Sequence, residues 1–161
     1  MIKYPEYDRS ILSVASSVLK HLGVSDCPHK TLPELDILLE KDYKNIVVML
    51  FDGLGVSAIN EHLGEDDFLR RHLVCPISSV YPSTTVAATT SIISGLSPLE
   101  SAWLGWDLYF GEIDETVAVF RNTKQDTNEK AADFNVSERF IPYKNIHNIH
   151  LDIFQYKFEC F

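Results

Sequence analysis

The chain has 161 residues, of which 45% are hydrophobic, and its formal net charge is −9. This length and hydrophobic content suffice for one globular domain with its own core, so residues 1–161 are expected to form a single domain. Lysine and arginine form no cluster in the sequence, which argues against a nucleic-acid-binding surface. No apolar stretch reaches the length of a membrane span, so no membrane partner is expected.

The cysteines and the N-terminus predict a cytoplasmic protein. Cys27, Cys75 and Cys160 are odd in number and irregularly spaced, a pattern typical of reduced intracellular proteins rather than of a disulfide framework. The first residues, Met-Ile-Lys-Tyr-Pro-Glu, contain no cationic segment that leads into an apolar run. A signal peptide is therefore not expected.

The N-terminal part of the chain is predicted to be helical. Between Asp8 and Leu22, apolar residues recur at intervals of three and four, as on the buried face of a helix. A second, short helix is predicted for residues 33–41, because Pro33 suits its first turn. His21 is a potential metal ligand, although a histidine also suits the negative C-terminal end of a helix.

The segment Asn45–Gly55 predicts a buried strand followed by a site residue. Six consecutive apolar residues, Ile46 to Phe51, are typical of a strand covered on both faces, as in a parallel sheet. Asp52 follows directly, and Gly53 and Gly55 permit a tight turn. Ligands of open α/β sheets bind outside the carboxyl ends of the strands, so Asp52 is a candidate ligand of a metal that holds a phosphoryl group.

Helices are predicted next for residues 56–63 and 66–72, and a strand for residues 74–81. The alternation of strands and helices predicts an α/β fold with a mostly parallel sheet flanked by helices. The acidic residues of this region could bind a metal, although such runs usually form a solvated face. They are Glu61, Glu65, Asp66 and Asp67.

The stretch Tyr81–Gly95 predicts a helix over residues 85–94 that begins among hydroxyl side chains. Ser83, Thr84 and Thr85 precede a run of small and apolar residues that ends at Gly95. Hydroxyl residues favour helix N-caps, and glycine favours the position after the last turn. The hydroxyls either cap the helix or, together with its free N–H groups, bind an anion such as phosphate.

Two motifs, Asp52-Gly-Leu-Gly and Ser94-Gly-Leu-Ser-Pro98, resemble those of the alkaline phosphatase superfamily, most closely its type I phosphodiesterase/nucleotide pyrophosphatase branch. The resemblance covers roughly residues 44–106. It implies that Asp52 binds a metal and that Thr85 is the nucleophile and bridges toward that metal. Zinc is the expected metal, with manganese or magnesium as alternatives. The implied reaction is hydrolysis of a small phosphate ester or phosphodiester through a phospho-enzyme on Thr85.

The sequence departs from the branch in three places. Val86-Ala-Ala-Thr89 stands where the branch has Phe-Pro-Asn-His, Ser101-Ala102 stands for His-Gly, and Trp106 stands near a phosphate-binding Asn. Nucleotide specificity therefore does not carry over. A sulfatase is less well matched, because Cys75-Pro-Ile-Ser-Ser does not fit its modified-cysteine motif.

The family's catalytic domain is much longer, and its remaining Asp and His ligands lie in a C-terminal half that this chain lacks. The resemblance therefore implies that residues 1–161 are the N-terminal portion of a phosphodiesterase-like catalytic domain, with an incomplete fold and no activity of their own. A non-catalytic binding module that retains the half-fold, and a phosphomutase or phosphotransferase of the same superfamily, remain alternatives. An uncovered sheet edge and apolar surface predict a homo-oligomer.

The last third of the sequence is rich in aromatic residues. Residues 103–110 form either a substrate wall or part of the core, strands are predicted at 108–110 and 116–120, and residues 121–138 are predicted as a loop. Residues 140–161 form an atypical aromatic tail. Its His147, His150 and Asp152 are potential metal ligands, but they lack the Asp-x-x-x-His spacing of the family.

Overall fold

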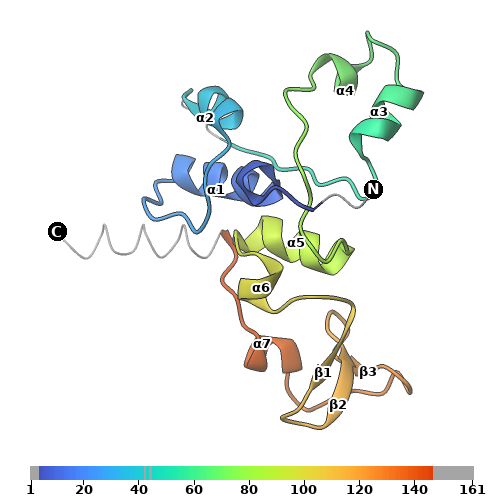
Figure 1. Cartoon of the computed structure of the whole chain (residues 1–161). Coiled ribbons are helices and arrows are strands. Elements are labelled where there is room, and N and C mark those ends of the chain that lie inside the picture. Colours follow the sequence, from blue (N-terminus) through green and yellow to red (C-terminus); the bar gives the residue numbers. More distant parts are fainter. Residues whose placement is uncertain (1–3, 42, 44, 147–161) are drawn as a thin grey trace, which may run out of the picture.

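The computed structural model describes residues 4–41, 43 and 45–146 (Figure 1). These residues form an α/β structure, so the coarse fold class predicted from the sequence is confirmed. The helices are η1 (Tyr7–Arg9), α1 (Ile11–His21), α2 (Pro33–Leu39), α3 (Val56–His62), α4 (Phe68–Arg71), α5 (Thr85–Ser94), α6 (Pro98–Ser101) and α7 (Val136–Phe140). The strands are β1 (Asp107–Phe110), β2 (Glu115–Ala118) and β3 (Thr123–Lys124). No helix in this part of the chain has the length and apolar character needed to cross a bilayer.

Helix α1 begins three residues later than the predicted start at Asp8, because Ser10 caps it. The Ser10 hydroxyl accepts a hydrogen bond from the Leu12 N–H at 3.2 Å, and the Ser10 N–H donates to the Ser13 hydroxyl at 3.4 Å. This reciprocal pairing satisfies backbone donors that the first turn leaves free. The preceding residues form the separate turn η1.

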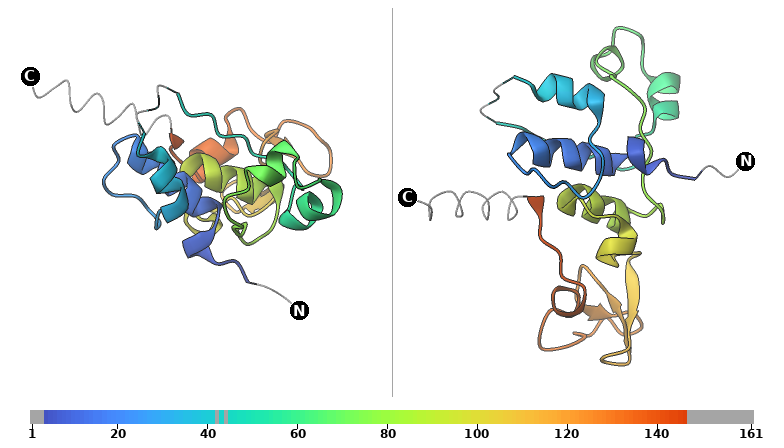
Figure 2. Two further views of the ribbon diagram at one scale, coloured as in Figure 1. Left: turned by 90° about the horizontal axis from the view of Figure 1, so that it is seen from above. Right: turned by 60° about the vertical axis from the view of Figure 1, so that its left-hand side comes forward.

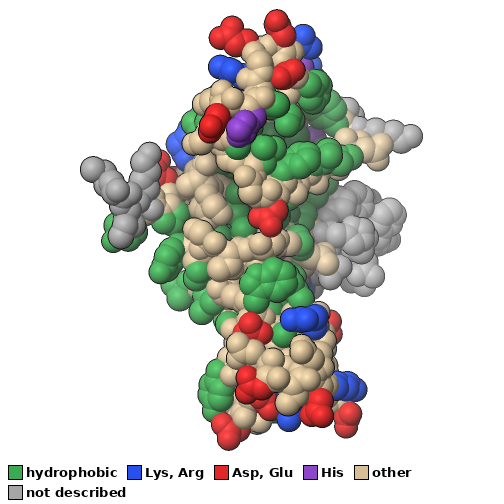
Figure 3. Space-filling view, turned by 90° about the vertical axis from the view of Figure 1, so that its right-hand side faces the viewer, with side chains coloured by type: hydrophobic (Ala, Val, Ile, Leu, Met, Phe, Trp, Pro, Cys, Tyr) green, Lys and Arg blue, Asp and Glu red, His purple; other side chains and the backbone are tan. Residues whose placement is uncertain are grey.

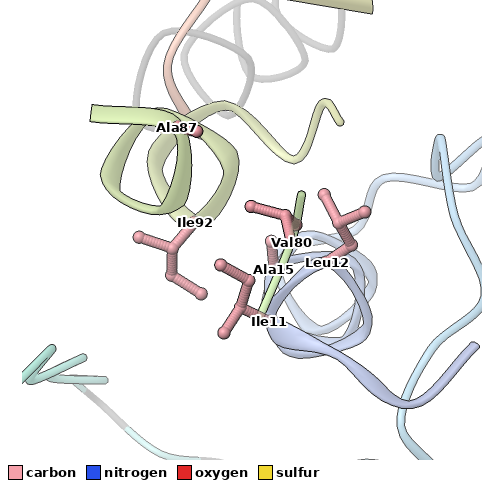
Figure 4. Packing of buried hydrophobic residues seen from close by; sticks show 6 residues of the cluster. All are labelled: Ile11, Leu12, Ala15, Val80, Ala87 and Ile92. Atoms are coloured by element: carbon pink, nitrogen blue, oxygen red, sulfur yellow. The ribbon is translucent and has the colours of Figure 1, made fainter. Parts of the chain in front are cut away.

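A first core lies between α1 and α5 (Figure 4). Ile11, Leu12 and Ala15 of α1 form one buried cluster with Ala87 and Ile92 of α5, and Val80 joins them from the segment before α5. Small residues on both helices, which include Ser16 and Ser91, are almost fully buried and allow the two helices to approach closely.

A second core joins α5 to the β-sheet and α7. It contains Val86 at the start of α5 together with Trp103, Phe110, Val117, Val119 and Val136. Because Val86 belongs to this core and Ala87 to the first, α5 lies between the two cores. The right-hand view of Figure 2 shows α5 between α1 and the β-sheet. Of the predicted aromatic stretch, Trp103 and Phe110 therefore serve the core.

The sheet differs from the predicted one. Its strand order is β1-β2-β3 and both pairings are antiparallel. Residues 46–51 and 74–81, the two predicted parallel strands, form no strand in the described structure; the one parallel pairing there is the isolated bridge between Ser10 and Ser78. A strand forms only where a second strand pairs with its backbone, and no described segment does so for residues 46–51.

Apolar surface remains exposed as a result. Val47 is 80% and Met49 69% exposed, and Phe51 is also exposed. Figure 3 shows apolar side chains across the middle of one face of the molecule, where an acidic side chain also lies, and most charged groups toward its two ends. Apolar patches of this kind usually mark a surface that another element covers.

The C-terminal predictions are partly confirmed. Strands β1 and β2 lie where two strands were expected, but residues 121–138, predicted as a loop, contain β3 and the start of α7. Asn122 holds this segment in place with its side chain. Its Nδ2 donates to the Phe134 carbonyl at 2.8 Å, and its Oδ1 accepts from the Val136 N–H at 2.9 Å.

Gly95 ends α5 in the left-handed conformation, with φ of 75°. A Cβ at this position would lie 3.1 Å from Leu19 Cδ1. Gly95→Ala is therefore expected to lower the free energy of unfolding by about 1–2 kcal/mol, measured by urea denaturation. Gly105→Ala is the matched control, because a Cβ there meets nothing within 4 Å. Equal stability of the two variants would contradict the expectation.

Candidate functional site

Asp52 lies at the end of the extended segment 46–51, in the first turn that follows it. Gly53 makes this turn possible with φ of 69°, a conformation that costs other residues more. The Gly55 N–H closes the turn by donating to the Gly53 carbonyl at 3.2 Å, and Gly55 then precedes α3. The turn leaves the Asp52 side chain exposed to solvent.

Thr85 is the first residue of α5, and Thr84 caps the helix. The Thr84 hydroxyl accepts from the Ala87 N–H at 3.3 Å, and the Thr84 carbonyl accepts from the Ala88 N–H at 3.0 Å. The capping interpretation is thus correct for Thr84. The N–H groups of Thr85 and Val86 have no acceptor among the described residues, so two donors remain at the helix start.

The structure brings Asp52 and Thr85 into contact. The Thr85 Oγ1 donates a hydrogen bond to the Asp52 Oδ2 at 3.3 Å, across 33 positions of sequence. The predicted proximity of the two side chains is therefore confirmed, although the parallel sheet from which it was argued is not formed. The contact is accessible to solvent. The roles of the two residues, as metal ligand and as nucleophile, stay predictions.

The other candidate residues make contacts with partners other than this pair. The His21 Nδ1 is 2.9 Å from the Leu39 carbonyl oxygen, which ties the end of α1 to the end of α2. Asp67 accepts from the Gly64 N–H at 2.7 Å and so stabilises the turn before α4. Trp106 packs edge-on against Phe120, with ring centroids 5.6 Å apart. His147, His150 and Asp152 lie outside the described residues.

The donor set at the pair is too small for a complete metal site. It consists of one carboxylate and one hydroxyl, whereas catalytic zinc sites typically use about three protein ligands. Among residues 4–41, 43 and 45–146, no three or more His, Cys, Asp or Glu side chains gather in a way that could hold a metal. The described residues therefore do not fit a bound metal by themselves.

Free N–H groups were expected at the start of this helix, but the sequence did not single out those of Thr85 and Val86. Which donors stay unpaired depends on the N-cap, and the structure gives that position to Thr84. The two hydrogen bonds show that the Thr84 hydroxyl faces the backbone and the Thr85 hydroxyl faces Asp52.

No family model, curated protein or solved structure matches this chain.

Proposed function

We propose that Asp52 and Thr85 form the N-terminal part of the active site of a phosphoryl hydrolase similar to the phosphodiesterases and nucleotide pyrophosphatases of the alkaline phosphatase superfamily. The observation that carries the proposal is the 3.3 Å hydrogen bond between Thr85 Oγ1 and Asp52 Oδ2. The two residues come from separate motifs, and each motif taken alone also fits a plain turn or a helix cap. Their contact at the start of a helix with free N–H groups favours a shared chemical role.

The residues present suit attack on phosphorus. In accepting the Thr85 hydrogen bond, Asp52 orients the hydroxyl oxygen, which is the proposed nucleophile. The N–H groups of Thr85 and Val86 are placed to donate to a phosphoryl oxygen, where negative charge is stabilised by the helix N-terminus. A threonine hydroxyl is a weak nucleophile at neutral pH and needs activation that these groups do not supply.

We infer that a divalent metal, zinc in the first place and manganese or magnesium as alternatives, supplies this activation when the site is complete. Asp52 would be one of its ligands, and the others would come from outside residues 1–146. The extended segment 46–51 would then belong to a mostly parallel sheet completed by the same additional residues. The substrate would be a small phosphate ester or phosphodiester.

The alternative that a specific observation favours is a non-catalytic module. The absence of a three-ligand cluster from the described residues is compatible with a protein that kept the half-fold and lost the chemistry. A phosphomutase or phosphotransferase would use the same Thr85 but pass the phosphoryl group to an acceptor other than water.

The proposal predicts activity once the missing ligands are supplied. A longer reading frame from the source gene that continues into an Asp-x-x-x-His motif is expected to hydrolyse p-nitrophenyl phosphodiester or monoester with added zinc or manganese. Release of p-nitrophenol measures the hydrolysis, and phosphorus NMR identifies the phosphoryl acceptor. Transfer to an added alcohol or sugar in place of water would favour the transferase. A longer protein without any turnover would favour the non-catalytic module.

A further inference from the structure

An apolar hollow of about 640 Å³ lies between α1, α5 and the extended segment 46–50. Its lining is mostly aliphatic and includes Val18, Leu22, Ile46, Val48, Leu50 and Ile92. A space of this size lined by aliphatic side chains gains stability when apolar groups fill it. The question is which apolar segment occupies it.

One wall of the hollow has the geometry of an unpaired strand. Ile46, Val48 and Leu50 line the hollow, while the intervening Val47 and Met49 are 80% and 69% exposed. This alternation is the side-chain period of a β-strand. In the part of the chain that the structure describes, no backbone hydrogen bond involves residues 46–51. The segment therefore offers an open strand edge beside an apolar hollow.

The chain itself returns to this hollow. Figures 1 and 2 show it running from α7 to the level of α1 and α5, where the described residues end at Ile146. Ile146 lines the hollow and packs against the first core. Fifteen residues, 147–161, follow it in the sequence. Three residues span at most roughly 10 Å, so the next part of the sequence lies within reach of the wall formed by residues 46–50.

The sequence after Ile146 has the pattern that this hollow requires. Ile149, Leu151 and Ile153 alternate with Asn148, His150 and Asp152. Such strict alternation is typical of a strand with one apolar and one polar face. If the apolar residues of this segment faced the hollow, its polar residues would lie on the solvent side, where Val47 and Met49 are exposed.

We propose that residues 149–153 dock against residues 46–50 as an added strand, with Ile149, Leu151 and Ile153 in the hollow. Strand addition to an open edge pairs backbone groups and buries alternate side chains, which gives both affinity and specificity. Because the two segments belong to one chain, the effective concentration of the tail at residues 46–50 is of millimolar order. A strand from a second copy of the chain would have to compete with this tail. The tail is then an internal cover for the hollow. This inference does not depend on the proposed function.

Disulfide trapping tests the placement and the source of the strand. The full chain with Cys27, Cys75 and Cys160 changed to Ser receives Leu151→Cys together with Ile46→Cys, Val48→Cys or Leu50→Cys. At least one pair is expected to form an intrachain disulfide under mild oxidation, detected by mass spectrometry and by faster migration on a non-reducing gel. The matched pair of Leu151→Cys with Val47→Cys, which faces away, is expected to cross-link at least tenfold more slowly. Disulfides formed mainly between chains, or equally by all pairs, would overturn the proposal.

Hydrogen–deuterium exchange tests whether the tail protects the strand edge. The triple variant Ile149→Asn, Leu151→Asn, Ile153→Asn is expected to exchange the amides of residues 46–50 at least tenfold faster than the parent chain. The matched triple variant Asn148→Ser, His150→Asn, Asp152→Asn changes only the polar positions and is expected to leave their exchange unchanged. Equal exchange of these amides in both variants would refute tail docking. Loss of their protection when the parent chain is diluted would also refute it, because the covering strand would then come from a second copy.

Discussion

Changing Thr85 to alanine is expected to lower kcat/KM for an aryl phosphodiester on the order of 10³-fold or more in a longer protein that completes the site. The variant loses the proposed nucleophile, and a loss of about 4 kcal/mol in transition-state stabilisation corresponds to a thousandfold decrease in rate. The contact of Thr85 with Asp52 is the reason to choose this residue among three neighbouring hydroxyls. Steady-state kinetics with added zinc or manganese measures the effect.

Thr84→Ala is the matched control for this experiment. Thr84 is the N-cap of α5, so its removal costs about 1 kcal/mol of stability but leaves the proposed nucleophile in place. Its kcat/KM is expected to fall less than tenfold. An inactive Thr84→Ala protein beside an active Thr85→Ala protein would place the nucleophile one position earlier than we propose.

Asp52→Asn separates the two proposed roles of Asp52. The amide oxygen can still accept the Thr85 hydrogen bond but carries no negative charge. A metal ligand needs that charge, so Asp52→Asn is expected to be nearly as inactive as Asp52→Ala. Retained activity in Asp52→Asn would indicate that Asp52 orients Thr85 and does not bind the metal.

The sequence predicted α5 with the bounds that the structure has, because both of its ends are set by local chemistry. Thr84 supplies a capping oxygen, and Gly95 adopts the left-handed conformation that stops the helix. The short helix α7 was missed, since five residues are too few for a periodic pattern. Its signal was the cap: the Asn135 side chain accepts from the Glu138 N–H at 3.1 Å.

The sheet could not be predicted from local residues as α5 was, because strand pairing depends on a partner that the strand's own residues do not specify. Residues 46–51 have the apolar content of a buried strand, and their alternate side chains face opposite sides, but no described segment pairs with them. The contact of Asp52 with Thr85 was predicted from a parallel sheet, and the described residues make it by another route. It depends on the turn at Gly53, on the N-cap Thr84 and on the packing of α5 against the first core.

The 161-residue chain by itself is expected to show no metal-dependent turnover of phosphate esters. Its described residues offer one carboxylate and one hydroxyl at the site, which are too few to hold a catalytic metal. Without a metal the Thr85 hydroxyl stays protonated, and the net charge of −9 disfavours the approach of phosphate. Exposed Val47, Met49 and Phe51 leave an apolar face uncovered even if the tail fills the hollow, so the chain is expected to associate into oligomers.

The test is to purify this chain, measure its mass in solution by analytical ultracentrifugation, and assay it with zinc, manganese and magnesium. Rates with each metal are expected to equal those of the Thr85→Ala variant of the same chain, which serves as the control for contaminating phosphatases. Association is expected to weaken in Val47→Asp but not in Leu99→Asp, which adds the same charge at an exposed apolar residue of α6. Turnover by a monomer that depends on both metal and Thr85 would mean that residues of this chain complete the site, and the first to examine would then be His147, His150 and Asp152.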